Sequence, residues 1–211
     1  MTLQELIAEA RLRLDDVSGK QLWSDLELTS YINEAQREAC ERALLLEEVR
    51  QLRVTAGRSA YRLPGVIQIK QATPHGRAPL EPADETKLDI AAPRWREELS
   101  GVMRWFVFRD EQLRIIASPA ADTTVTLQLY RLPSDRMANP DDEPEIAERH
   151  HMRMLDWALH RAYMKRDADA NSPQLAAQHE AAFTASFGIR QDANVQRKQR
   201  EHRTHTVRSN F

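Results

Sequence analysis

The sequence predicts an α+β fold: a four-helix bundle body, a small antiparallel β unit inserted into it, and an extended C-terminal arm. Three observations predict this. Apolar residues recur at steps of three or four near both ends of the 211-residue chain, which is the period of a helix. In the middle they alternate with polar residues, which is the period of a strand. After residue 188 they almost disappear. The predicted boundaries are 1–48 and 142–188 for the helical body, 49–133 for the β insertion and 189–211 for the arm.

The first predicted helix begins with a capping box. Thr2 is the N-cap and Glu5 stands three residues on, so each side chain can bond to the backbone N–H of the other. The helix runs to about Leu14, with the apolar stripe Leu3, Ile7, Ala10 and Leu14. A short connection at residues 17–21 indicates that this helix and the next are antiparallel neighbours.

A second capping box, formed by Ser24 and Glu27, opens the helix around which the chain is predicted to be organised. Trp23 before the cap and Leu28 after it can pack together as a hydrophobic staple. This central helix is predicted to continue to about residue 46. Its apolar stripe comprises Leu28, Ile32, Ala35, Ala39, Ala43 and Leu46.

The middle of the chain has the signals of about six short strands. Leu52 and Val54, then Tyr61 and Leu63, alternate with polar residues on either side of the turn signal at 56–59, which predicts a hairpin. Further strands are expected at 66–69, 102–108, 113–116 and 125–129, with a turn at 110–111 and a short helical turn at 84–90.

Two more helices are predicted near the C-terminal end. Asp142 or Glu143 caps the third, with Pro144 in its first turn. Its core-facing stripe is Ala147, His151, Met154, Leu155, Ala158 and Ala162, with Trp157 and Tyr163 beside it. Ser172 and Pro173 start the fourth helix, and Gly188 is a typical residue to end it. Its stripe is Leu175, Gln178 or His179, Ala182, Phe183 and Phe187.

The charge is unevenly distributed. The whole chain has a net charge of −2, but residues 189–211 hold six Lys/Arg against two Asp/Glu, and the remaining 188 residues hold 24 against 30. An acidic body with a basic tail indicates that the tail has a partner of its own. The single cysteine, Cys40, fits a reducing compartment. No apolar run approaches 18 residues, so we expect a soluble protein that is made in a cytoplasm.

The sequence contains no motif that indicates catalysis. None of the six glycines falls in a phosphate-binding pattern, there is no G-x-S-x-G, and Cys40 lies mid-helix. His150, His151 and His160 share one predicted helix without the H-E-x-x-H spacing of a zinc site, and His179 lies on the next. We therefore expect no catalytic residue, no metal site and no cofactor. The basic tail lacks aromatic residues between its charges, which disfavours base stacking and leaves protein docking and other roles open.

Several segments resemble those of one family, in the same order. They are Leu22-Trp23-Ser24-Asp25, Tyr31-Ile32-Asn33-Glu34-Ala35, Tyr61-Arg62-Leu63-Pro64, Leu129-Tyr130-Arg131-Leu132-Pro133, Trp157-Ala158-Leu159 and Phe187-Gly188. Together they resemble the head–tail connector (adaptor) proteins of tailed bacteriophages, which form the ring beneath the portal. The family pattern has a glycine in the turn where this chain has Asp110-Glu111.

The resemblance implies a structural protein of the virion with no catalysis, assembled in the host cytoplasm. Similar proteins form a dodecameric ring, dock on the portal protein partly through a C-terminal arm, extend the channel for double-stranded DNA and present a surface to tail or nozzle proteins. The residues that this assigns to the portal-docking arm are Arg190, Arg197, Lys198, Arg200, Arg203, Arg208 and Phe211. The alternative is a DNA-binding or regulatory module that uses the same basic tail.

The polar face of the central helix is a candidate contact between subunits of such a ring. Its residues are Asn33, Gln36, Arg37 and Glu41. A face that is merely solvated is an equally good interpretation, because charged helix faces are common in monomers.

Overall fold

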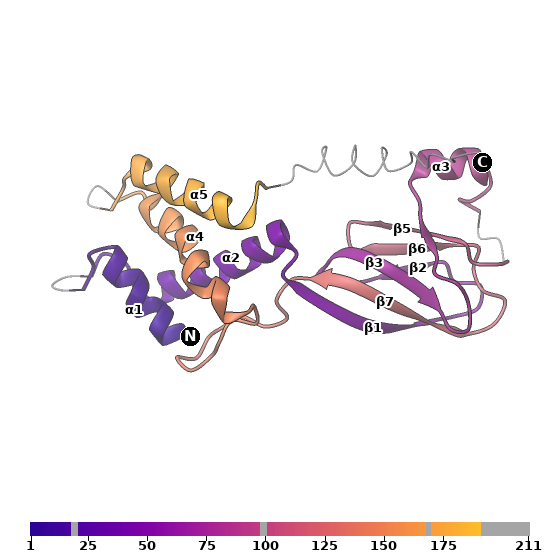
Figure 1. The fold of residues 1–211 in the computed structure, drawn as a ribbon, viewed down its shortest axis with the longest axis horizontal. Helices are drawn as coiled ribbons and strands as arrows, with labels where there is room; N and C mark the ends of the chain where they lie inside the picture. Colours follow the sequence, from indigo (N-terminus) through magenta and orange to yellow (C-terminus); the bar gives the residue numbers. More distant parts are fainter. Residues whose placement is uncertain (18–20, 98–100, 168–169, 191–211) are drawn as a thin grey trace, which may run out of the picture. The chain divides into compact units, whose positions relative to one another are not determined.

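The computed structural model describes residues 1–17, 21–97, 101–167 and 170–190 (Figure 1). The chain divides into two compact units. The helical unit comprises residues 1–46 and 131–190, with helices α1 (Leu3–Arg13), α2 (Asp25–Ala43), α4 (His151–Tyr163) and α5 (Pro173–Phe187) and the 3₁₀ turn η1 (Glu148–His150). The β unit comprises residues 47–130, of which 98–100 are not described, and residues beyond the described part of the chain. It contains β1 (Leu46–Val54), β2 (Ala60–Arg62), β3 (Val66–Pro74), β4 (Glu81–Pro82), α3 (Glu85–Ala91), β5 (Trp105–Arg109), β6 (Gln112–Ile116) and β7 (Thr123–Arg131).

The prediction of a four-helix bundle body with one small β unit is wrong. Within the described residues the chain is α+β with five α-helices, one of them in the β unit, and two separate sheets. Within this unit α4 makes the most extensive contacts: α1, α2 and α5 all pack against it, and α2 also packs against α1 and α5. The physical reason is that α4 is apolar on more than one face. Its buried residues are His151, Met154, Leu155, Trp157, Ala158, Leu159 and Ala162, and a helix that is apolar on several faces is enclosed by neighbours.

The capping box of α2 is confirmed. The Glu27 N–H donates to Ser24 Oγ (3.3 Å) and the Ser24 N–H donates to Glu27 Oε2 (2.8 Å). Trp23 and Leu28 lie in one buried cluster. The predicted end at residue 46 is three residues too late, because α2 ends at Ala43 and Leu44 adopts a left-handed conformation with φ 52°. Residues 46–54 then form β1.

Glu27 makes the stability of the helical unit depend on pH. Lys165 Nζ lies 2.8 Å from its carboxylate, and this hydrogen bond, with that from the Ser24 N–H, lowers the pKa of Glu27 from 4.5 to about 2. Because the folded-state pKa is the lower one, the stabilisation is present above about pH 4.5 and is lost as the pH falls towards 2.

We expect Glu27→Gln to lower the free energy of unfolding at neutral pH, because it removes the charge that Lys165 and Ser24 stabilise. The loss should be only about 1 kcal/mol, because the Glu27 side chain is 35% exposed and solvent screens its charge. The difference from the unsubstituted protein should shrink near pH 3. Urea denaturation at the two pH values measures it, and a difference that does not change with pH would contradict the assignment.

The predicted start of the third helix is wrong. Residues 142–147 are not helical, and η1 and α4 begin at Glu148 and His151. Asp142 serves a different element: its side chain accepts from the N–H groups of Ala138 and Asn139, and its carbonyl accepts from the Leu3 N–H (2.7 Å). The Pro140 carbonyl accepts from the Gln4 N–H (3.0 Å). This loop therefore satisfies N–H groups in the first turn of α1, which have no partner within their helix.

The predicted hairpin of the first two strands is also wrong. One sheet has the strand order β1-β7-β3 and the other β2-β6-β5-β4, so β1 and β2 lie in different sheets. The loop between them is held by Tyr61 of β2, whose hydroxyl accepts from the Thr55 N–H (3.0 Å) and donates to the Arg58 carbonyl (2.9 Å). The predicted helical turn at 84–90 is confirmed as α3.

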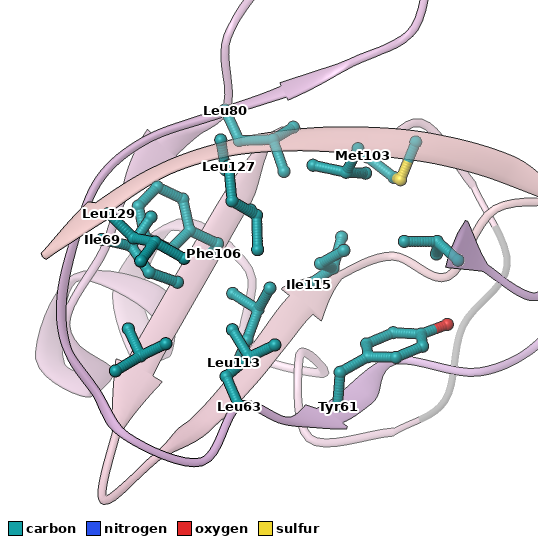
Figure 2. Close-up of a cluster of buried hydrophobic side chains, with 14 residues drawn as sticks. Tyr61, Leu63, Ile69, Leu80, Met103, Phe106, Leu113, Ile115, Leu127 and Leu129 are labelled. Atoms are coloured by element: carbon teal, nitrogen blue, oxygen red, sulfur yellow. The ribbon is translucent and has the colours of Figure 1, made fainter. Parts of the chain in front are cut away.

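Both sheets contribute to the core of the β unit. Figure 2 shows that side chains of the two sheets meet there, among them Leu127 and Leu129 from β7, Phe106 from β5 and Leu113 and Ile115 from β6. A second, smaller cluster at α3 contains Leu88, Trp95 and Ile116. The two sheets thus form a β-sandwich that encloses one core, and α3 adds a separate small core.

The turn between β5 and β6 stores backbone strain. Arg109 pairs with Gln112, which leaves Asp110 and Glu111 as a two-residue loop, and both have positive φ (50° and 60°). Two-residue turns of this kind favour glycine at such positions. Glu111 has a compensating contact, because its carboxylate accepts from the Gly65 N–H (2.8 Å).

We expect Asp110→Gly to raise the free energy of unfolding by about 1 kcal/mol, because glycine adopts positive φ without steric strain. Glu111→Gly is the matched comparison. It relieves similar strain but removes the bond to Gly65, so its net effect should be smaller or destabilising. Denaturant unfolding of both variants measures this, and a larger gain for Glu111→Gly would contradict it.

Candidate functional site

The candidate site is the point at which the chain leaves the helical unit towards the predicted arm. α5 ends at Phe187, which is buried, and Gly188 has φ 88°. Ile189 and Arg190 follow and are exposed. Of the predicted arm residues, only Arg190 is described. The other six, Arg197, Lys198, Arg200, Arg203, Arg208 and Phe211, lie outside the described residues.

Arg42 of α2 fastens this exit. Its side chain is only 3% exposed and pairs with Glu38, one turn earlier, at 2.8 Å; the Glu38 side chain is 8% exposed. The same guanidinium donates to Thr184 Oγ1 (3.0 Å) and to the Gly188 carbonyl (3.3 Å). Arg42 therefore ties the last turn of α5 and the residue after it to α2.

Aromatic rings complete the environment of this guanidinium. It lies over the rings of Trp157 (4.9 Å to the centroid) and Phe183 (5.0 Å). Phe183 in turn packs on Trp157 and Phe187. Cation–π contacts of a desolvated guanidinium are favourable, so the charge of Arg42 is compensated by Glu38 and the rings together. Arg190 Nε also lies 3.7 Å from Glu38, which brings the first basic residue of the predicted arm to the same carboxylate.

The four residues predicted as a subunit contact are not alike. Asn33 and Gln36 are buried and bond within the helical unit. The amide of Asn33 donates to the Met137 carbonyl (2.9 Å) and accepts from the Met137 N–H (2.8 Å), and Gln36 accepts from the Glu145 N–H (2.8 Å). Their physical role is to hold the 132–147 loop on α2. Arg37 and Glu41 are exposed, and for these two the subunit contact stays a prediction.

Glu145, near the end of this loop, binds the residues at its start. Its carboxylate accepts from Arg131 (2.7 Å) and from the Ser134 N–H (2.5 Å). Burial alone raises the pKa of Glu145, but the hydrogen bonds from Arg131, Asp135 and Ser134 outweigh it and leave the pKa below its ordinary value. The carboxylate is therefore charged at neutral pH, and the loop is fastened both to α2 and to the end of β7.

We expect Asn33→Leu to destabilise the helical unit by about 2 kcal/mol, because it leaves the buried N–H and carbonyl of Met137 without partners. The exposed Arg37→Leu is the control and should change stability by less than about 0.5 kcal/mol. Thermal unfolding followed by circular dichroism measures both. Equal effects of the two substitutions would show that Asn33 acts as a surface residue.

The cysteine and three of the histidines that could act as nucleophiles or metal ligands are buried or bonded within the fold. Burial raises the pKa of the Cys40 thiol to about 12, so it is not a nucleophile at neutral pH. His151 bonds to the Ile146 carbonyl, His160 to the Ala176 carbonyl and His179 to Asp156. Among the described residues, no three His, Cys, Asp or Glu side chains converge as metal ligands. No helix within that part of the chain is both long and apolar enough to cross a membrane.

Sequence reasoning missed Arg42 and Glu38. A signal for Arg42 was present, since it stands three and seven residues after Ala39 and Ala35 and so lies on the apolar stripe of α2. A charged residue on such a stripe is rarely buried unless it is paired, which points to an internal ion pair.

One comparison with known proteins identifies a family. A family model described as "SU10 adaptor protein" matches residues 1–208 of this chain. No curated protein matches the chain.

Proposed function

The chain belongs to the SU10 adaptor protein family and is therefore a phage adaptor protein, a structural protein of the virion; from this we propose that it docks on the portal. In this proposal copies of the chain form a ring, a dodecamer, beneath the portal, and the ring extends the channel for double-stranded DNA and offers a surface to tail proteins. Arg37 and Glu41 are proposed to contribute to the contact between neighbouring subunits. The docking arm is proposed to be residues 190–211.

The observation that carries this proposal is that Arg42 holds the chain at Gly188, where it leaves the helical unit. The arm has to reach a second protein while its own helical unit stays folded. Arg42 meets that requirement by binding the Gly188 carbonyl, Thr184 and Glu38 at once. A segment that begins at Arg190 thus starts from a defined point on a folded unit, which reduces the loss of freedom on docking.

The distribution of charge supports the same proposal. The helical unit holds 13 Lys/Arg against 19 Asp/Glu, whereas residues 191–211 hold five against two. Attraction to DNA phosphates needs clustered basic residues, so an acidic unit suits a channel through which DNA slides. The basic segment suits an acidic surface on a protein partner.

Deletion of residues 191–211 tests the arm. We expect the truncated chain to keep the circular dichroism of the full chain but to lose co-sedimentation with purified portal rings. A second variant, in which Arg197, Lys198, Arg200, Arg203 and Arg208 are replaced by glutamine, separates charge from length and should bind with a weaker dependence on salt. Undiminished binding by the truncated chain would overturn the assignment of the arm.

The basic tail also favours a second candidate, a module that binds DNA. That function requires affinity of the free protein for duplex DNA, falling steeply as salt is raised. Gel-shift titrations of the full and truncated chains at several salt concentrations distinguish the two. The adaptor function predicts weak binding by both chains.

A further inference from the structure

β1 is an open edge of the β unit. It stands at the end of the order β1-β7-β3, and no strand within the described residues lies beyond it (Figure 1). It is nine residues long, whereas the edge strands of the other sheet, β2 and β4, have three and two. The outer edge of β3 is covered at Ala72, whose carbonyl accepts from the Leu80 N–H (2.8 Å). Of the edges that the structure describes, β1 thus offers the longest free one.

This edge has only part of the protection that keeps strands apart. Sheet edges are commonly protected by proline, a bulge or charged side chains, lysine above all. The β1 sequence LEEVRQLRV contains neither proline nor lysine, but it carries Glu47, Glu48, Arg50 and Arg53, and Arg50 Nε lies 2.8 Å from the Glu48 carboxylate of the same strand. Its exposure alternates without interruption from Leu46 to Arg53, as in a regular strand without a bulge. Val49, in the middle, is 66% exposed. A long, regular edge of this kind is a template for another strand.

The order of side chains along β1 is complementary to itself. In an antiparallel pair, directly opposite residues lie on the same face and interact. A two-fold axis at Val49 sets Leu46 opposite Leu52, Glu47 opposite Gln51 and Glu48 opposite Arg50 of a second copy, and Val49 opposite its own copy. Every one of these pairs joins two apolar residues, an acid and a base, or an acid and an amide.

The neighbouring registers set like charges on the two-fold axis. A shift of two residues in one direction sets Arg50 opposite Arg50, although it also sets Glu47 opposite Arg53, and a shift in the other direction sets Glu48 opposite Glu48. Like charges that face each other across a strand pair are destabilising. A shift of one residue moves exposed side chains to the half-buried face. The sequence therefore selects the register centred on Val49.

We propose that β1 is a self-pairing surface, through which two copies of this chain join edge to edge in an antiparallel dimer centred on Val49. The two three-stranded sheets then form one sheet of the order β3-β7-β1-β1-β7-β3. The contact is isologous, so it closes at two copies and does not propagate around a ring. It is a property of the free protein, and it does not rest on the proposed function.

Charge reversal with rescue tests the register. Sedimentation equilibrium of the full chain, from micromolar to millimolar concentration, should show a monomer–dimer equilibrium. Arg50→Glu and Glu48→Arg each create like-charge pairs at two symmetric positions, so each should weaken dimerisation by at least about tenfold. An equimolar mixture of the two variants should restore it, because the mixed pair again sets an acid opposite a base at both positions. The chain that carries both substitutions should also dimerise.

Disulfide trapping tests the position of the two-fold axis without changing any charge. Under mild oxidation Val49→Cys should give a covalent dimer, since the two new thiols face each other. Glu47→Cys and Gln51→Cys should not, because each is about 14 Å from its own copy in this register. The native Cys40 is buried. A protein that stays monomeric at every concentration would overturn the proposal, as would a dimer that the charge reversals leave unchanged or that cross-links equally at all three positions.

Discussion

Replacing Arg42 by alanine is expected to lower the free energy of unfolding of the helical unit by about 3–4 kcal/mol, because it leaves the buried carboxylate of Glu38 without its main partner. The substitution also removes the bonds to Thr184 and Gly188 and the contacts with the rings of Trp157 and Phe183. Arg190, 3.7 Å from Glu38 and largely exposed, can replace only a small part of this. Trp23 and Trp157 lie in this unit but Trp95 and Trp105 lie in the β unit, so the change is measured by urea unfolding followed by circular dichroism, to which the helices contribute most.

The matched control removes both charges together. Arg42→Met combined with Glu38→Leu deletes the ion pair without leaving a buried charge, and exchanges of this kind are often nearly neutral. We therefore expect the double variant to be more stable than Arg42→Ala. A double variant that is as unstable as the single one would show that the bonds to the end of α5, rather than the unpaired carboxylate, dominate the loss.

Arg11→Ala is expected to destabilise the same unit by about 3 kcal/mol, because it breaks a second buried ion pair. Arg11 and Asp16 are both buried and their side chains lie 2.6 Å apart. Arg11 also donates to the Trp23 carbonyl (2.9 Å) and pairs with Asp25 (2.6 Å). One guanidinium thus joins the end of α1, the turn after it and the start of α2. Thermal unfolding followed by circular dichroism measures its loss.

Arg13→Ala is the comparison on the same helix. Arg13 forms a partly exposed pair with Glu9, one turn earlier, and pairs of this kind contribute about 0.3–0.5 kcal/mol. The two substitutions remove an arginine side chain from positions two residues apart on α1. The difference between their losses of stability therefore reports the effect of burying the ion pair. If Arg13→Ala proved as damaging as Arg11→Ala, helix propensity rather than the ion pair would explain both.

The features that the sequence predicted well depend on neighbours in the chain. The capping boxes of α1 and α2 and the bounds of α5, from Pro173 to Phe187, are confirmed. Each depends on residues a few positions apart, so propensity and capping decide them. The buried stripe of α4 was likewise visible as steps of three and four. The proposed arm residues beyond Arg190 lie outside the described part of the chain, and their role stays a prediction.

The features that the sequence did not reveal depend on distant partners. The turn signal after Val54 is real, but strand pairing with β7 and β6 draws β1 and β2 into different sheets, and no local pattern distinguishes that from a hairpin. The helix expected at Asp142 is absent because that carboxylate and carbonyl bond to the loop and to Leu3. Asn33 and Gln36 were assigned to a surface because their partners, Met137 and Glu145, stand more than 100 residues away.

The two-part composition of the helical unit has a consequence for synthesis on the ribosome. Its first part ends at residue 46 and its second begins at residue 131, with the continuous segment 47–130 between them. During translation α1 and α2 emerge long before α4, the helix against which both pack. At ordinary elongation rates, the 117 residues from Leu46 to Tyr163 take roughly 6 to 23 s. The sandwich can therefore fold while the first two helices are still without their partner, so the unit that begins the chain is the last to be completed.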